Sequence, residues 1–369
     1  MAVTAEAKFI TDLIEKADVT TVLATVFVIM GVYLALVVAA GTSLTARSIL
    51  FKSSLFARSV AHLFLSNEKA RWPKDRPDPD VVKDMKFTAV KRVIFVRHGE
   101  STWNEVFNRG FGPMFPVRLV VGLVKELSML VSRSSFFVDA PLSKLGYDQA
   151  RALRAHMASD QIKGLSPGDP GASDAAALMG TSGTSIVVAS NLRRAVATTA
   201  IAFWDRLART GEKVYVLSCL QEMARNVDAY ALAGTREAVP LHGIESHIAN
   251  YQAAGFRKSD SGSVVGLNCH FNAGNKPIAR NGMASMLEFA AWAAAQDADT
   301  IIAGGHSLWF KEFFKAFLPK SSTHKSKKKK IVNCGVVAFT IQHARHPKHG
   351  DLFRIDPDTV DVVYGGFAK

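Results

Sequence analysis

The chain has 369 residues and a mass of 40.0 kDa, which fits one large domain with appendages better than a single minimal domain. Hydrophobic residues make up 48% of the chain and charged residues 21%, a balance that excludes a disordered protein. The formal net charge of +13 favours anionic partners such as phosphates, anionic lipid or nucleic acid.

The first predicted element is a membrane-spanning helix at residues 19–41, which follows an N-terminal tail at 1–18. No charged residue occurs between Asp18 and Arg47, and this run supplies the roughly 20 apolar residues that a helix needs to cross a bilayer. A buried core helix is disfavoured because the run has no polar stripe. A cleaved signal peptide is disfavoured because the tail lacks a positive balance and the apolar run is too long.

Basic residues on one side of this span predict its orientation. Residues 47–66 contain Arg47, Lys52 and Arg58 and no acidic residue. Positively charged flanks stay on the cytosolic side of a membrane, so we expect a single-pass protein whose large C-terminal domain faces the cytosol. A mitochondrial membrane, with the domain in the matrix, is the alternative.

Residues 42–86 are expected to form an amphipathic juxtamembrane helix and a linker. Apolar residues recur at helical spacing over 45–66, which fits either a helix on the bilayer surface or a helix packed on the large C-terminal domain. Residues 71–80 contain three prolines among alternating charges and predict an extended linker. The folded domain is expected to start near Phe87 and to extend to residue 369.

Short apolar runs then alternate with longer helical stretches. The expected strands are 92–97, 184–189, 213–217, 300–303 and 331–341, and the expected helices are 147–158, 192–207, 282–295 and 308–317. This alternation predicts an α/β protein with helices on both faces of a layered sheet. In such sheets, functional residues gather at the carboxyl ends of the strands.

Four of the expected strands are followed by residues that carry chemistry. The segments are RHGESTWN (97–104), SNLRRA (190–195), LQE (220–222) and GGHS (304–307). Guanidinium groups orient a phosphate, an imidazole can attack phosphorus, and a carboxyl group can protonate the leaving oxygen and later deprotonate water. The set therefore suits phosphoryl transfer without a metal.

Together with DAPLSKLG at 139–146, these motifs resemble the phosphoglycerate-mutase-like branch of the histidine phosphatase superfamily over about residues 91–341. The resemblance implies a three-layer α/β/α sandwich with a mostly parallel sheet, and neither a metal nor another cofactor. It implies that His98 is the nucleophile that becomes phosphohistidine and that Glu222 is the proton donor. Arg97 and Arg194 would hold the phosphate oxygens, and His306 would donate to the phosphoryl group.

Further residues near these motifs have less defined roles. The resemblance implies that Asn104 lines the phosphate pocket, so it is a candidate substrate-binding residue together with the two arginines and the second histidine. Arg193 is expected to be a surface neighbour. Glu100 and Asp139 are weaker rivals for the role of Glu222.

Two segments depart from the resemblance. An apolar insert at 105–140 stands where phosphoglycerate mutases carry a different sequence, which argues against glycolytic mutase activity. Its apolar residues recur at helical spacing and fit either a lid helix or a second helix that touches the membrane. The basic loop at 320–330 is expected to be solvated or to attract anionic lipid, and nucleic-acid binding is disfavoured.

The sequence therefore predicts a membrane-anchored phosphatase that hydrolyses a phosphomonoester or phosphoprotein through phosphohistidine. Its substrate would be a phosphorylated protein, a lipid head group or a small molecule. The alternative is a structural or docking subunit of a membrane complex, for which a mitochondrial complex is one option, with a vestigial phosphatase-like domain. A chain starting at residue 87 is expected to keep activity on small soluble phosphoesters.

Overall fold

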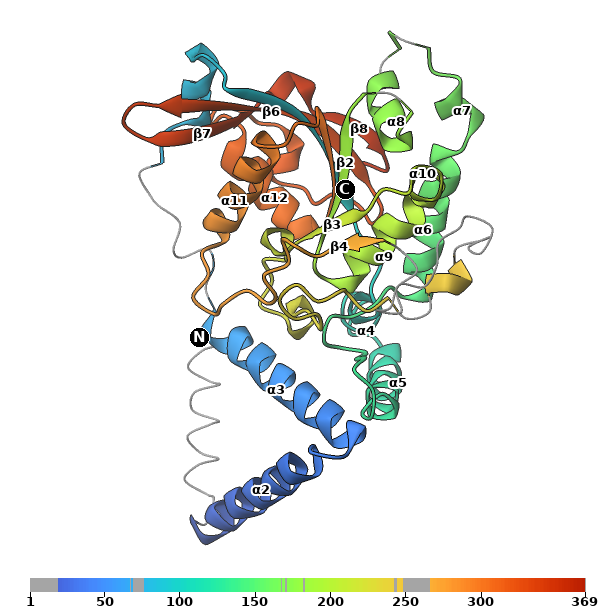
Figure 1. The fold of residues 1–369 in the computed structure, drawn as a ribbon, viewed down its shortest axis with the longest axis vertical. Coiled ribbons are helices and arrows are strands. Elements are labelled where there is room, and N and C mark those ends of the chain that lie inside the picture. Colours follow the sequence, from blue (N-terminus) through green and yellow to red (C-terminus); the bar gives the residue numbers. More distant parts are fainter. Residues whose placement is uncertain are drawn as a thin grey trace.

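An eight-stranded sheet forms the centre of the molecule in this computed structural model (Figure 1). The structure describes residues 19–66, 68, 76–166, 168–169, 171–181, 183–241, 244–247 and 266–368. The predicted tail at 1–18 and residues 71–75 of the predicted linker lie outside this part of the chain. In chain order the strands are β1 (Ala89–Arg97), β2 (Ser185–Ser190), β3 (Val214–Leu217), β4 (Leu267–Asn268), β5 (Thr300–Gly305), β6 (Val336–His346), β7 (Gly350–Ile355) and β8 (Asp361–Tyr364).

The sheet is mostly parallel. Its order is β4-β3-β2-β5-β1-β6-β7, and β8 pairs with β6 beside β7. Strands β1 to β5 run parallel to one another, whereas β6, β7 and β8 form antiparallel pairs. Arg97 of β1 is opposite Gly305 of β5, and Ala189 of β2 is opposite Gly304. The carboxyl ends of these three strands therefore meet at one edge, where the sequence places its motifs.

Helices cover both faces of the sheet, which confirms the expected three-layer sandwich (Figure 1). One face packs against α6 (Lys144–Met157), α8 (Ala172–Met179), α9 (Arg193–Ala202) and α10 (Trp204–Thr210). The other face packs against α11 (Gly282–Ala294) and α12 (Ser307–Phe317). Alternate residues of β1 face the two layers, so Ile94 belongs to one core and Phe95 to the other.

Two expected elements differ from those observed. The predicted helix 192–207 is divided into α9 and α10 at Phe203, after Thr198 and Thr199 bond back to carbonyls four residues earlier, a pattern that bends helices. The predicted strand 331–341 begins only at Val336, because Cys334 has a φ of +55° and turns the chain before the strand.

The N-terminal helix α2 (Val19–Ala39) is long and apolar enough to cross a membrane. Its side chains are almost all exposed, as expected of a helix without protein neighbours around it. The next helix, α3 (Leu44–Leu65), starts after a short turn in which the Arg47 guanidinium donates to the carbonyls of Ala40 and Gly41 at 2.6 and 2.8 Å.

Helix α3 packs on the folded domain, one of the two arrangements expected for it. Lys52 is buried, forms an ion pair with Glu126 at 2.9 Å and donates to the carbonyl of Met129 at 3.0 Å. Leu55 joins a hydrophobic cluster of the domain. Downstream, the 3₁₀ helix η1 (Pro79–Asp84) packs beside β7, and Asp80 forms an ion pair with Arg354 at 2.9 Å. The folded unit therefore includes residues upstream of 87.

The apolar insert begins within α4 (Thr102–Phe107) and contains α5 (Met114–Ser128). Several apolar side chains of α5 face solvent, and Val120, Val124 and Leu127 are 58%, 60% and 67% exposed. Figure 1 places α5 at the same end of the molecule as α2 and α3. In the basic loop, Lys327 donates to the backbone carbonyls of Pro319, Lys320 and Ser322, and residues 328–330 are exposed.

Candidate active site

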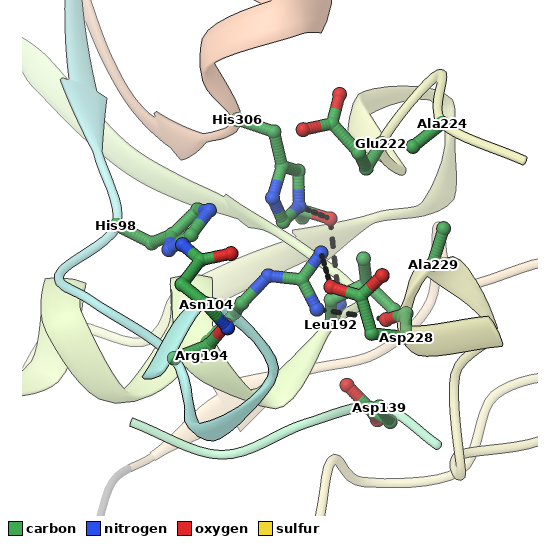
Figure 2. A network of polar contacts seen from close by, with 12 residues as sticks. His98, Asn104, Asp139, Leu192, Arg194, Glu222, Ala224, Asp228, Ala229 and His306 are labelled. Carbon is green, nitrogen blue, oxygen red and sulfur yellow. Dashed lines mark hydrogen bonds and ion pairs between the residues drawn. The ribbon is translucent and has the colours of Figure 1, made fainter. Parts of the chain in front are cut away.

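Two histidines lie side by side at the carboxyl edge of the sheet. His98 follows β1 and His306 follows β5, and the last residues of these strands are paired. The two ring centroids are 5.0 Å apart and the ring planes are inclined by 58°. Figure 2 shows both rings together with Arg194 and Glu222. Two motifs more than 200 positions apart are thus joined by a parallel strand pair.

The surroundings of His98 suit a nucleophile. Its Nδ1 lies 2.6 Å from the carbonyl oxygen of Gly99, and a carbonyl can only accept, so Nδ1 carries the proton. Burial, and then the charges of Arg194 and Arg97, hold the pKa of His98 well below its usual value. The ring is therefore neutral at pH 7, and Nε2 has a free lone pair.

His306 presents a different nitrogen. Its Nε2 lies 2.9 Å from the hydroxyl oxygen of Ser190, at the end of β2. Its Nδ1 is buried and has no hydrogen-bond partner among the described residues. Burial, followed by the charge of Arg194, lowers the pKa of His306 well below its usual value.

The two arginines carry further unpaired donors. Arg97 donates from Nη1 to the carbonyl of Ile331 at 2.6 Å, and Arg194 donates from Nη1 to the carbonyl of Asp228 at 2.8 Å. Within the described part of the chain, the buried Nε atoms of both arginines have no partner. Buried N–H groups are rarely left without an acceptor, so the two guanidinium groups point to an anion at this edge.

Glu222 is fixed by the backbone around it. Its Oε1 accepts hydrogen bonds from the backbone N–H groups of Met223 at 2.9 Å and Trp309 at 3.2 Å. Trp309 belongs to the first turn of α12, the helix that begins directly after His306. One motif thereby orients the carboxyl group of another.

Asn104 lies on α4, directly after the loop that carries His98. Its side-chain oxygen accepts from the Asn108 amide at 2.9 Å, and its backbone N–H donates at 3.2 Å to the hydroxyl of Ser101, which caps the helix. The rivals of Glu222 are engaged elsewhere. Glu100 is paired with Arg109 and accepts from the Ser143 hydroxyl at 2.7 Å.

Asp139 and Arg193 form a buried structural contact. Asp139 accepts from the backbone N–H groups of Arg193 and Leu232, both at 2.9 Å, and burial raises the pKa of this carboxyl group. The expectation that Arg193 is a surface residue was wrong: the side chain is 4% exposed and its guanidinium bonds to Ser134 and to the carbonyls of Ser135 and Asp139. The sheet-side position of α9 buries both neighbouring arginines.

Asp228 was missed by sequence reasoning. It is buried, and its carboxylate lies 3.4 Å from Nη2 of Arg194 (Figure 2). Burial raises its pKa to about 6, against the opposing effect of Arg194. Asp228 belongs to none of the recognised motifs, and no local pattern in the sequence distinguishes it. Among the described residues there is no cluster of three or more His, Cys, Asp or Glu side chains that could hold a metal ion.

Comparisons with known proteins give distant structural matches. No family model matches the chain, and no curated protein sequence matches it. The alpha-ribazole phosphatase from Shigella flexneri shares 16% identity, with a TM-score of 0.32 over 72% of this chain and 95% of the other. A mycobacterial glucosyl-3-phosphoglycerate phosphatase shares 18% identity, with a TM-score of 0.32 over 72% and 97% of the two chains. A phosphoserine phosphatase from Entamoeba histolytica shares 15% identity, with a TM-score of 0.28 over 76% and 97%.

Proposed function

We propose that this protein is a membrane-anchored phosphatase that hydrolyses a phosphomonoester or phosphoprotein through a phosphohistidine intermediate. One observation carries the proposal: among the described residues, three buried nitrogen atoms near a neutral His98 have no hydrogen-bond partner, namely the Nε atoms of Arg97 and Arg194 and the Nδ1 of His306. Donors in this arrangement stabilise the charge that spreads over the phosphoryl oxygens during transfer. The motif resemblance to the histidine phosphatase superfamily agrees with this chemistry.

In the first step, the lone pair of His98 Nε2 forms a bond to phosphorus as the bond from phosphorus to the leaving oxygen breaks. The Gly99 carbonyl keeps the Nδ1 proton in place and accepts a stronger bond as the ring gains positive charge. Arg97, Arg194 and His306 hold the phosphoryl oxygens. Protonated Glu222 gives its proton to the leaving oxygen, which departs as an alcohol.

In the second step, water replaces the imidazole. The Glu222 carboxylate removes a proton from water while the water oxygen bonds to phosphorus, and the phosphorus–nitrogen bond breaks. Inorganic phosphate leaves, His98 is neutral again, and Glu222 is protonated for the next cycle. The bonds from Met223 and Trp309 occupy Oε1, so we assign both proton transfers to Oε2.

The anchor limits which substrates the site can reach. We propose that α2 spans the membrane and that the catalytic domain faces the cytosol, with the mitochondrial matrix as the alternative. Because α3 packs on the domain, the site stays near the bilayer. Phosphates on membrane proteins or lipid head groups therefore reach the site at a raised effective concentration.

A docking subunit is the second candidate, because the exposed apolar side chains of α5 fit a protein partner as well as a membrane. The two candidates differ in turnover. If the purified full-length protein fails to hydrolyse every member of a panel of phosphoesters and migrates with a large detergent-solubilised assembly, the docking function replaces the phosphatase.

The nucleophile is tested with His98→Ala in the full-length, detergent-solubilised protein. The wild type should release phosphate from an aryl phosphate and, after rapid acid-free quenching, carry a phosphoryl group that is stable to base and labile to acid. The variant should show neither. His349→Ala, an exposed histidine outside the motifs, is the matched control and should behave as the wild type. Wild-type turnover in His98→Ala would refute the mechanism.

A further inference from the structure

A buried ion pair connects the end of the juxtamembrane helix to the loop of Glu222. Glu68, just beyond α3, and Lys276 are 7% and 3% exposed, and the Lys276 Nζ donates to the Glu68 carboxylate. The same Nζ donates to the carbonyl of Glu222 and, at 3.3 Å, to that of Ala224. An ammonium group has three protons, so all three have acceptors.

Lys276 thereby holds the backbone on both sides of Met223, next to the proposed proton donor. Gln221 reinforces this arrangement, because its Oε1 accepts from the Lys276 backbone N–H at 3.0 Å and its Nε2 donates to the Ala229 carbonyl at 2.7 Å. Residues 221–224 are therefore tied both to residue 276 and to the loop that contains Asp228.

Helix α3 packs against the same loop. Leu55 shares a hydrophobic cluster with Val227, Tyr230 and Leu232, and the His62 ring meets Tyr230 edge-on at 5.3 Å. His62 also lies 3.8 Å from the Glu68 carboxylate. Helix α3 therefore packs against the end of the loop that connects Glu222 to Asp228.

We propose that Glu68 and Lys276 are positioning residues that place Glu222 for proton transfer. The catalytic site then depends on the packing of the juxtamembrane helix α3 against the domain. This inference rests on the proposed function. It reverses the expectation that a chain starting at residue 87 keeps its activity, because that chain lacks Glu68 and α3 and leaves the Lys276 ammonium buried without its carboxylate.

Leaving-group dependence separates positioning from a general loss of folded protein. A nitrophenolate leaves without much help, whereas phenolate needs the proton that Glu222 supplies. A misplaced Glu222 therefore lowers kcat/KM for phenyl phosphate more than for p-nitrophenyl phosphate, whereas a smaller folded fraction lowers both equally. Because general acid catalysis contributes roughly 100-fold or more, Glu222→Gln should widen the ratio of the two kcat/KM values by about that factor.

Glu68→Gln in the full-length, detergent-solubilised protein should widen this ratio at least about tenfold, part of the full general-acid effect. Lys276→Met should do the same, because it removes the donors to the Glu222 and Ala224 carbonyls. The matched control is Glu212→Gln, which breaks the ion pair of the buried Arg206 on α10 and should leave the ratio unchanged.

Amide hydrogen exchange gives a second measurement that does not depend on turnover. Peptides covering residues 221–231 should exchange faster in Glu68→Gln than in the wild type, and at the wild-type rate in Glu212→Gln. A wild-type ratio together with unchanged exchange in Glu68→Gln would overturn the coupling. A wild type without turnover or phosphohistidine would instead overturn the proposed function, while the exchange result would still decide whether α3 supports the loop.

Discussion

Asp228 gives the sharpest test of how the proposed phosphate pocket is held together. Its carboxylate lies 3.4 Å from Arg194, whose side chain is 2% exposed, and its own carbonyl accepts from the same guanidinium at 2.8 Å. Asp228→Asn keeps the shape and the backbone contact but removes the charge. Hydrogen bonds to charged groups contribute about 1.5–3 kcal/mol, so a fully misdirected Arg194 should lower kcat/KM roughly 10- to 150-fold.

The pH dependence makes this prediction specific. Burial raises the pKa of Asp228 from 3.8 to about 6, so the carboxylate that holds Arg194 takes up a proton as the pH falls through about 6. We expect kcat/KM of the wild type to fall below that pH and to be level above it. The asparagine side chain of Asp228→Asn cannot titrate, so the pH profile of its kcat/KM should lack the decrease below a pH of about 6.

The raised pKa of Asp228 also makes the free energy of unfolding depend on pH, and in the opposite direction to the activity. Between pH values of about 4 and 6, the folded chain holds the Asp228 proton while the unfolded chain has released it. The free energy of unfolding should therefore fall as the pH rises through this window, and Asp228→Asn should flatten that slope in urea titrations.

The assay is the pH profile of kcat/KM for p-nitrophenyl phosphate, with phosphate inhibition as a measure of anion binding. The matched control is Asp205→Asn, an exposed partner of Arg154 at 2.6 Å, which should stay within about twofold because exposed pairs contribute little. If Asp228→Asn keeps both the wild-type kcat/KM and its decrease at low pH, the assignment of Asp228 to the pocket is refuted.

Three further predictions concern the fold and the anchor. Arg193→Ala should lower the free energy of unfolding by roughly 1–3 kcal/mol for each buried carbonyl, of Ser135 and Asp139, that it leaves without a donor, and it should leave turnover per folded molecule unchanged. Gly146→Ala should cost about 1–3 kcal/mol and slow turnover, since a Cβ there overlaps the Glu100 carbonyl oxygen, whereas Gly112→Ala meets nothing within 4 Å and should be neutral. Protease added from the cytosolic side of sealed vesicles should digest the large domain, and its survival until the membrane is opened would contradict the proposed orientation.

Local sequence patterns were sufficient for most of the architecture. A short uninterrupted apolar run such as 93–96 favours a strand buried on both faces. The 28 residues between Asp18 and Arg47 carry no charge and predict a membrane helix without any tertiary information. Parallel pairing then places the residues after each strand at one edge, so the meeting of His98 and His306 followed from the order of the motifs.

The support of the site was decided by contacts that no local pattern records. Glu68 and Lys276 are 208 positions apart, and neither stands in a motif, yet they are buried against each other beside Glu222. Arg193 and Arg194 have adjacent positions and the same chemistry, and both are buried, with Arg193 bonded to Ser134 and Arg194 to Asp228. The sequence by itself predicted five of the eight strands, a helix apolar enough to cross a membrane and the residues proposed to react, but it did not predict β4, β7 or β8. Only the packing of α3, α9 and the loop at 221–231 decided which charges are buried and paired, because burial depends on neighbours that are distant along the chain.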